Sequence, residues 1–277
     1  MLYTDSNGKS HCAFVRDKGE VIVSAGAIGS PQLLLLSGIG PHSILSSLKI
    51  PTIYHQPNVG EFMFDNPRNG ITLIFPSQIE PSFIQVVGIT CDYYIEAFSY
   101  VETLSPTPSS FCFLPSSSSS SNMTFGVLYE KFPGPLSSGA LWLSSSTDAK
   151  TTPHVRFNYF ANPIDLSRCV SGVRKIGEML NTQAMDRFKY KGYKGTLGFM
   201  FYGPPLPTNL SDNSLVEEFC RSTVLTVYHY HGGCVVGSVV DGDFRVTGIR
   251  SLRVVDGSTF SLSPGTNPQA TVMMLGR

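Results

Sequence analysis

The chain has 277 residues, of which 42% are hydrophobic and 14% charged, and its formal net charge is zero. This composition is typical of a globular protein with one large domain or two modest ones. The neutral charge balance gives no reason to expect binding to nucleic acid or to an anionic membrane. Apolar runs such as the four leucines at 33–36 are far shorter than the roughly 18 residues of a membrane span.

The opening 60 residues predict alternating strands and helices. A β-hairpin is expected across residues 2–15, because its Asn-Gly turn readily adopts positive φ angles. The β-branched run at 20–26 predicts a buried strand. Ser30 is expected to cap a helix that has Pro31 in its first turn. Residues 42–60 predict a connection with a short helical piece.

Strands are expected in the middle of the chain, and two helices follow them. Alternating apolar residues predict strands at 71–75, 86–90, 124–129, 139–143 and 154–157. The Pro- and Ser-rich stretch at 105–121 is interpreted as a mobile surface loop or as a gate over a substrate pocket. Helices are predicted from Asp165 to Leu180 by apolar residues at helical spacing, and from Ser214 toward Val224 by a capping-box pattern.

Cysteine spacing and sequons bear on the cellular compartment. The six cysteines form no CxxC pair, so a structural zinc site is not expected. Sequons at Asn122 and Asn209 hint at a secreted glycoprotein. Residues 1–20 contain no apolar stretch, so no signal peptide is predicted. A mature or truncated secreted protein would reconcile these observations.

His229 and His231 are the first candidates for chemistry. They alternate within residues 228–233, Tyr-His-Tyr-His-Gly-Gly, so an extended strand would place both imidazoles on one face. A neutral imidazole beside a substrate hydroxyl can accept its proton, because its ordinary pKa lies near neutral pH. Two structural histidines are the alternative. A metal pair is not expected, because no further ligand lies nearby in the sequence.

Asn267 and Pro268 precede an apolar segment at 269–274 that predicts the start of a helix. Backbone amides at such an N-terminus can face an anionic or electron-rich ligand. The alternative is an ordinary capped helix without a ligand.

Five segments together carry a resemblance to a known family. Residues 21–41 resemble the second signature of the glucose–methanol–choline (GMC) family of FAD-dependent oxidoreductases. More narrowly, the plant mandelonitrile lyase branch of that family is similar at residues 230–237, 241–249, 252–260 and 274–277. The resemblance covers essentially the whole chain, but only the C-terminal half of a full-length family member.

The resemblance implies a fold, a cofactor and a reaction. The implied fold class is α/β (α+β). Portions of an FAD-binding doubly wound domain are expected at 1–62 and 232–277, and a substrate domain with an antiparallel sheet and helices at 63–231. The implied cofactor is FAD, and the implied substrate is a small α-hydroxy compound. Family members oxidise alcohols, or cleave cyanohydrins to an aldehyde and cyanide without net redox change.

The resemblance also implies roles for individual residues. His229 matches the catalytic acid/base that takes the substrate hydroxyl proton, and Asn267 matches a second catalytic position. Contact with the flavin is implied for Val21, Ala25, Asp256, Gly257, Asn267 and Pro268. Cys169 and Cys220 match the positions of a disulfide, with two reduced buried thiols as the alternative. His231 then has a structural role.

Three sites depart from the lyase pattern. The lyases carry a histidine where this chain has Asn267, a cysteine near Glu96, and a Tyr-Trp pair where this chain has Val227 and Tyr228. Loss of an imidazole removes electrostatic stabilisation of a departing cyanide, and loss of a tyrosine hydroxyl removes a hydrogen-bond donor to the substrate oxygen. A negative Glu96 in the pocket would oppose the departure of cyanide further. We therefore expect Glu96, Val227 and Tyr228 in the substrate pocket, with alcohol oxidation as a candidate beside lyase chemistry.

The sequence contains no strand-GxGxxG-helix unit, which binds the FAD pyrophosphate in this family. Weakened FAD binding is therefore expected for this polypeptide as it stands. A truncated, catalytically silent fragment or paralogue is the alternative to an enzyme. For full-length family members the resemblance implies the secretory pathway, extracellular or vacuolar.

Overall fold

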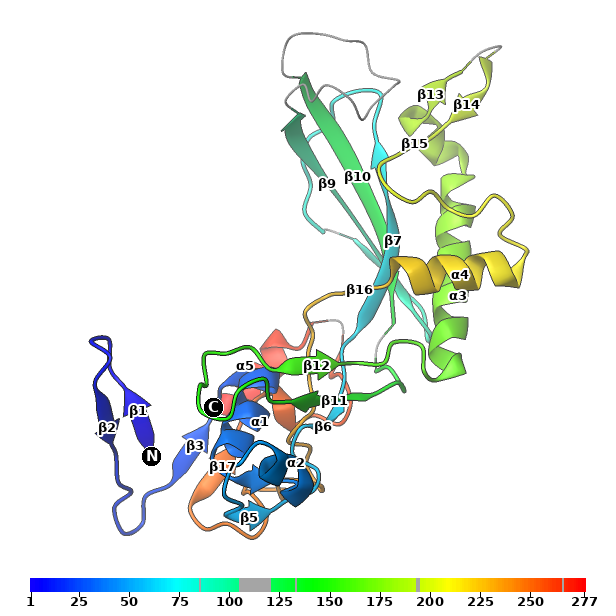
Figure 1. Ribbon diagram of the computed structural model, residues 1–277. Helices are drawn as coiled ribbons and strands as arrows, with labels where there is room; N and C mark the ends of the chain where they lie inside the picture. Colours follow the sequence, from blue (N-terminus) through cyan, green and yellow to red (C-terminus); the bar gives the residue numbers. More distant parts are fainter. Residues whose placement is uncertain (85, 105–120, 133, 193–194, 266) are drawn as a thin grey trace. The chain divides into compact units, whose positions relative to one another are not determined.

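The computed structural model describes residues 1–84, 86–104, 121–132, 134–192, 195–265 and 267–277 (Figure 1). These residues form two compact units. Unit 1 comprises Met1–Asp65, Ser137–Asn158 and Tyr228–Arg277, and unit 2 comprises Asn66–Leu136 and Tyr159–Val227. The segment predicted as a loop or gate at 105–121 lies, except for its last residue, outside the described residues. Among the described helices, none combines the length and apolar character needed to span a bilayer.

Unit 1 combines short strands with helices. Its helical elements are α1 (Gly26–Leu36), α2 (His42–Ser47), the 3-10 turn η3 (Gly257–Thr259) and α5 (Gln269–Gly276). Its strands are β1 (Leu2–Thr4), β2 (Ser10–Cys12), β3 (Val21–Val23), β4 (Ile39–Gly40), β5 (Tyr54–His55), β6 (Glu61–Met63), β11 (Gly139–Trp142), β12 (His154–Arg156) and β17 (Leu252–Val254). The predicted hairpin is present as β1 and β2, and β11 pairs with both β12 and β6.

A parallel pair, β3 with β17, joins segments from near the two ends of the chain. Val21 lies opposite Leu252 in the register of this pair. The strand predicted at 20–26 is present, but the expectation that it is buried was wrong. Within the described ranges β3 pairs only with β17, and Ile22 is 59% exposed.

The first helix begins earlier than the sequence predicted. α1 starts at Gly26 rather than after a cap at Ser30, so Pro31 lies inside the helix. The Ser30 hydroxyl is engaged elsewhere, because it accepts the Ala25 amide at 3.0 Å and donates to the Asp256 carboxylate at 2.5 Å. A long-range acceptor therefore replaces the local capping role.

Unit 2 is a twisted antiparallel sheet covered by helices. Its strands are β7 (Pro67–Ile74), β8 (Val87–Ile89), β9 (Tyr94–Leu104), β10 (Ser121–Lys131), β13 (Tyr190–Lys191), β14 (Leu197–Gly198), β15 (Met200–Phe201) and β16 (Leu225–Thr226). Its helical elements are α3 (Pro163–Leu180), η1 (Gln183–Phe188) and α4 (Asn213–Thr223). The main sheet has the order β15-β7-β10-β9-β8, and β16 pairs with β7.

One face of this sheet packs against α3 and α4, which lie on the same side of it (Figure 1). The two-residue alternation of the strands directs the buried side chains Ile71, Leu73, Ile95 and Leu128 into that core. From α3 the core receives Leu166, Cys169, Val170, Val173, Ile176 and Leu180, all residues of the face predicted from helical spacing. The predicted amphipathic helix is therefore confirmed.

The second helix has a different cap from the one expected. Asp212, not Ser214, caps α4, because its Oδ1 accepts the amides of Ser214 and Leu215 at 2.9 and 3.4 Å. A carboxylate near a helix N-terminus also interacts favourably with the helix dipole. The helix itself is present where it was predicted.

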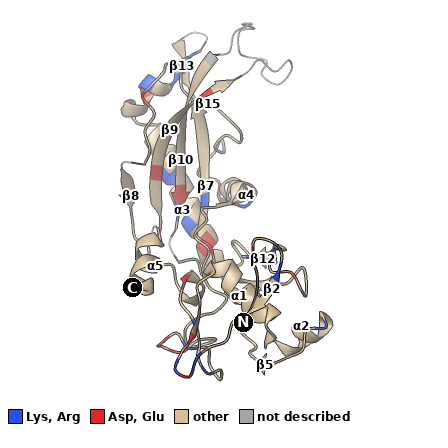
Figure 2. Cartoon of the chain, turned by 90° about the vertical axis from the view of Figure 1, so that its left-hand side faces the viewer, with Lys and Arg blue, Asp and Glu red and all other residues tan. Residues whose placement is uncertain are grey.

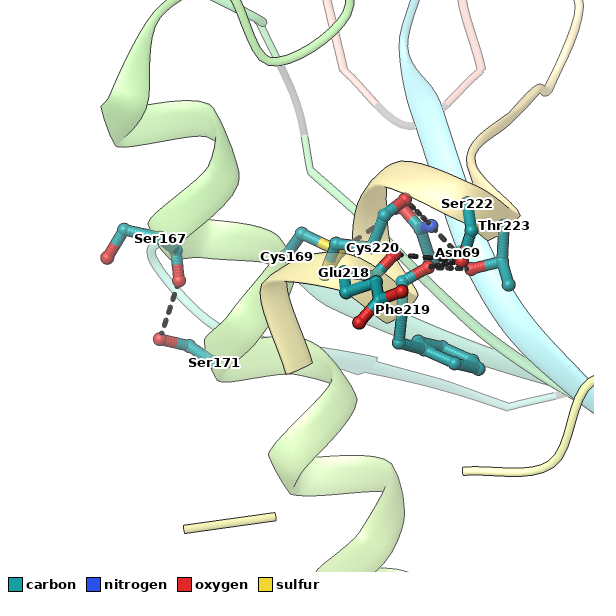
Figure 3. Close-up of a disulfide and its surroundings, with 9 residues drawn as sticks. All are labelled: Asn69, Ser167, Cys169, Ser171, Glu218, Phe219, Cys220, Ser222 and Thr223. Carbon is teal, nitrogen blue, oxygen red and sulfur yellow. Dashed lines mark hydrogen bonds between the residues drawn. A yellow bond between two sulfur atoms is a disulfide. The ribbon is translucent and has the colours of Figure 1, made fainter. Parts of the chain in front are cut away.

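A disulfide joins α3 to α4 (Figure 3). It links Cys169 and Cys220, as the family resemblance implied, and the alternative of two reduced thiols was wrong. Beside it Asn69 of β7 donates its side-chain amide to the carbonyl of Cys220 at 2.7 Å and to the hydroxyl of Thr223 at 2.9 Å. The sheet and both helices are thus tied together at one point.

Candidate active site

The two histidines lie in an irregular segment of unit 1, so the expected extended strand was wrong. Tyr228, before them, has φ +64°, and Gly232 and Gly233, after them, have φ +87° and +93°. These left-handed conformations interrupt strand geometry. Gly232 is needed for a second reason, because an added Cβ would overlap the carbonyl oxygen of Phe62.

His231 is almost fully buried, with 2% of its surface exposed. Its peptide group exchanges two hydrogen bonds with that of Phe64, at 2.8 and 3.0 Å, and its ring stacks on the Phe64 ring with 5.2 Å between centroids. Its Nδ1 lies 2.9 Å from the carbonyl oxygen of His229. A carbonyl can only accept, so Nδ1 carries the proton and donates.

The other ring nitrogen of His231, Nε2, is buried and has no hydrogen-bond partner within the described part of the chain. Burial lowers the pKa of this imidazole, and the hydrogen bond to His229 opposes that shift more weakly. Both observations favour a neutral His231 ring with its proton on Nδ1.

His229 is half-buried, and its main chain is held on both sides. Its N–H donates to Oδ1 of Asp65 at 3.0 Å, and its carbonyl accepts from His231. Asp65 is buried. The candidate base thus lies between two buried polar side chains of unit 1.

Aromatic rings surround the same segment. Tyr230 stacks on Phe157 with a centroid separation of 5.2 Å, and Tyr228 meets the Tyr230 ring edge-on at 6.4 Å. Tyr228 is 73% exposed despite its left-handed backbone. Such a conformation is uncommon for a bulky residue and is found most often at functional sites. Val227 is half-buried and is the last residue of unit 2.

Asp256 is a buried link between distant segments. Its Oδ2 accepts the Gly26 amide at 2.9 Å and the Ser30 hydroxyl, and its Oδ1 accepts the Ser258 amide at 2.8 Å. These bonds fix the turn after β3 against the turn after β17. The carboxylate thus shapes the backbone around the two strand ends.

The histidine segment runs alongside this turn. The Gly232 amide donates to the Gly257 carbonyl at 3.2 Å, and the Cys234 amide donates to the Ser258 carbonyl at 2.9 Å. The sequence motif and the predicted flavin segment at Gly257 are therefore neighbours. Cys234 is buried, and this burial raises the pKa of its thiol to about 12, so it is a poor nucleophile at neutral pH.

The remaining candidates for cofactor contact are more dispersed. Ala25 and Gly257 follow the carboxyl ends of the parallel strands β3 and β17, whereas Val21 is the first residue of β3. Four extended residues span about 13 Å, so Val21 and Ala25 mark opposite ends of the strand. Asn267 is exposed, and Pro268 is the half-buried residue before α5.

The N-terminus of α5 and the ends of β3 and β17 bear on the fit of FAD, the cofactor implied by the resemblance. In α5 the first-turn amides receive no capping bond from a described side chain, so they remain available to an electron-rich ligand. Crevices beyond the carboxyl ends of parallel strands are the usual ligand sites of α/β sheets. Ala25 and Gly257 lie at such ends, and the donor set fits a nucleotide cofactor.

Glu96 lies in unit 2 and is not a lone charge. Its Oε1 is 2.6 Å from Nζ of Lys131 on the neighbouring strand, and both side chains are buried. The ammonium also lies 4.7 Å from the Tyr94 ring centroid. In Figure 2, blue segments (Lys, Arg) and red segments (Asp, Glu) mark charged residues along β9 and β10. Glu96 therefore presents a compensated ion pair to its surroundings.

Sequence reasoning missed one partner of a candidate residue in each unit. Asp65 is separated from its partner His229 by 164 residues, and Lys131 is separated from Glu96 by a complete strand reversal. No local spacing pattern connects either pair.

Comparisons with known proteins bear on the whole chain. Two family profiles, both described as GMC oxidoreductase, match residues 2–68 and 135–276. An (R)-mandelonitrile lyase 1 of Prunus serotina is 53% identical over 278 residues, and an (R)-mandelonitrile lyase-like protein of Arabidopsis thaliana is 54% identical over 279 residues. The sinalpyl alcohol oxidase Nec3 of Nesocodon mauritianus is 46% identical over 282 residues.

These relatives are matched by all of the chain, but the chain covers only 49%, 50% and 50% of their lengths respectively. The chain thus spans about half the length of the curated relatives it matches.

Solved structures show the same fold at low sequence identity. A pyridoxine 4-oxidase from Mesorbium loti superposes with a TM-score of 0.75 at 18% identity, over 99% of this chain and 52% of that one. A formate oxidase superposes with a TM-score of 0.74 at 20% identity, over 99% of this chain and 55% of that one. The predicted mixed fold of helices and antiparallel sheets is confirmed.

Proposed function

This chain belongs to the GMC oxidoreductase family, and from that premise we propose that it supplies the catalytic base and part of the flavin site of an enzyme acting on a small α-hydroxy compound. The family consists of FAD-dependent flavoproteins. We assign the flavin to unit 1, with Val21, Ala25, Asp256, Gly257, Asn267 and Pro268 at its site. We propose Glu96, Val227 and Tyr228 as residues that determine the substrate.

One observation carries the proposal. The segment of His229 is hydrogen-bonded to the turn that contains Gly257, so the candidate base and the candidate flavin segment adjoin within unit 1. Catalysis of this kind needs a proton acceptor held at a fixed distance from the cofactor.

In the proposed reaction the neutral imidazole of His229 accepts the proton of the substrate hydroxyl. The side-chain amide of Asn267 orients the same oxygen by hydrogen bonding. FAD, when bound, supplies the acceptor for the hydride that leaves an alcohol carbon. In cyanohydrin cleavage the same proton transfer lets the oxygen form the carbonyl. The bond between the carbinol carbon and the nitrile carbon breaks, and cyanide leaves with the electron pair of that bond.

Different observations favour the two reactions. Overall similarity to mandelonitrile lyases favours cyanohydrin cleavage. Asn267 favours oxidation, because an amide cannot supply the positive charge that a second imidazole would offer to a departing cyanide. The pairing of Glu96 with Lys131 removes an argument against cleavage, since the carboxylate charge is compensated.

The test is to express the chain, add FAD, and assay mandelonitrile beside benzyl alcohol. Benzaldehyde formed from mandelonitrile without oxygen uptake indicates cleavage, and peroxide formed from the alcohol indicates oxidation. His229→Ala should lower either activity by about 100-fold or more, whereas His42→Ala, at an exposed histidine, should not. A colourless protein that fails to take up FAD would favour the catalytically silent alternative.

The disulfide supports passage through an oxidising compartment, because such bonds persist mainly in secreted proteins. We therefore propose that the protein follows the secretory pathway and carries glycans. Mass spectrometry of peptides from plant-expressed protein, covering Asn122 and Asn209, tests this directly. Unmodified asparagine at both positions would contradict the glycan assignment.

A further inference from the structure

We propose that His231 is a positioning residue for the reaction, and that with Asp65 it forms a clamp on the main chain of His229. This inference rests on the proposed function of His229, extends it to Asp65, and replaces the structural role expected for His231. The clamp consists of the side chains of Asp65 and His231.

The clamp holds the two peptide groups that flank the His229 side chain. The Asp65 carboxylate accepts the N–H of His229 at 3.0 Å, and His231 donates to its carbonyl at 2.9 Å. Fixing both groups restricts the φ and ψ angles of His229, and these angles set the direction of its Cα–Cβ bond.

The clamp is itself rigid. Both of its side chains are buried, and His231 is held by two backbone bonds to Phe64 and by stacking on the Phe64 ring. A base must lie within hydrogen-bond reach of the proton that it takes, and a misplacement of about 1 Å can cost 100-fold in rate. Rigid support of the base is therefore a direct contribution to rate.

The Nε2 atom of His231, which has no hydrogen-bond partner among the described residues, is a second, independent observation. A buried acceptor without a partner is unfavourable, so packing alone would be better satisfied by an apolar ring such as phenylalanine. A histidine at this position is explained by its Nδ1–H group, which a phenylalanine cannot supply.

Three substitutions separate the role of each atom. In His231→Asn the side-chain nitrogen occupies the place of Nδ1, so the bond to the His229 carbonyl can persist. In His231→Gln the nitrogen occupies the place of Nε2, and in His231→Phe the ring remains but both nitrogens are lost. His42→Phe, at an exposed site, is the matched control.

We expect His231→Phe and His231→Gln to lower kcat by about 10- to 100-fold with KM changed less than about 3-fold. His231→Asn should recover most of that loss. The midpoint of urea unfolding should stay nearly constant in His231→Phe, because the removal of one unpaired nitrogen offsets the loss of one hydrogen bond. If all three variants lose the same activity and their urea midpoints fall by matching amounts, His231 has only a structural role.

A measurement without turnover makes the test independent of the proposed function. In chain labelled with ¹⁵N-histidine, His231 should be a neutral ring protonated at Nδ1, and the titration of His229 should shift in His231→Phe but not in His42→Phe. An Nε2-protonated His231 would overturn the clamp whatever the activity. If the parent chain turns over neither substrate while these signals appear as expected, the proposed function fails and the clamp stands.

Discussion

At the scale of single residues, unit 2 contains a buried carboxylate with a counter-charge and, among the described residues, a buried carboxyl without one. Glu96 and Lys131 form a buried ion pair, whereas Glu130, next to Lys131 in the sequence, has two buried oxygens without a hydrogen-bond partner in the described ranges. Burial lowers the pKa of Lys131, and its bond to Glu96 opposes that shift. The two sites therefore predict different responses to substitution and to pH.

Removing one partner of the ion pair should be costly. Lys131→Met leaves Glu96 buried without its counter-charge, and such losses typically lower the free energy of unfolding by about 3–5 kcal/mol. The double variant Glu96→Gln with Lys131→Met should recover most of the lost free energy of unfolding. Lys175→Met, which breaks the exposed pair with Glu178, should change the free energy of unfolding by less than about 1 kcal/mol. Urea titrations of the four proteins measure these differences, and an unaffected Lys131→Met would contradict them.

Glu130 should make stability fall as pH rises. Burial raises the pKa of its carboxyl well above the ordinary 4.5 in the folded protein. Below pH 4.5 both states keep the proton. Above it the unfolded chain ionises first, so folded stability is lost by up to about 1.4 kcal/mol per pH unit until the folded pKa is reached. In urea titrations between pH 5 and 8, Glu130→Gln should flatten the slope of the free energy of unfolding against pH. An unchanged slope would mean that other groups cause the pH dependence.

At the scale of elements, the disulfide should supply a measurable part of the stability of unit 2. Cys169→Ser with Cys220→Ser releases a crosslink across 51 residues and should lower the free energy of unfolding by about 3–4 kcal/mol. Reductant should have the same effect on the parent protein and little on this variant. Cys91→Ser, at an exposed free cysteine, is the matched control. Equal stability of the variant and the parent would rule out this role.

The same scale shows what the sequence could predict. The α3 helix was predictable because its apolar face is set by a local period, and β7 and β10 because their side chains alternate. Helix starts were less predictable, because Ser30 bonds to a carboxylate far along the chain and Asp212 outcompetes Ser214 as a cap.

The candidate site divides in the same way. Its motif residues could be identified by resemblance, and so could the Cys169–Cys220 disulfide. The alternation of residue types predicted a strand at 229–231, but it does not reveal the left-handed Tyr228 before the segment or Gly232 after it, and the described segment has an isolated bridge between His231 and Phe64 instead. Asp65 could not be inferred at all, since its contact with His229 forms only in the folded chain.

At the scale of the whole molecule, the two units should respond to different agents. Each unit has its own buried core, so local opening in one need not open the other. FAD should slow amide hydrogen exchange in peptides from α1 and α5, because a bound ligand stabilises the state that binds it. Reductant should speed exchange in peptides from α3 and α4. Protection by FAD confined to α3 and α4 would contradict the assignment of the flavin to unit 1.

The parallel pairing of β3 with β17 has a consequence for biosynthesis. Gly26 and its acceptor Asp256 are 230 residues apart. At translation rates of about 5–20 residues per second, β3 waits on the order of 10 to 50 seconds for β17 to leave the ribosome. During that interval the apolar residues of β3 and α1 lack their final neighbours. Nascent chains of this protein should therefore engage chaperones before synthesis ends, and the demand should come from unit 1.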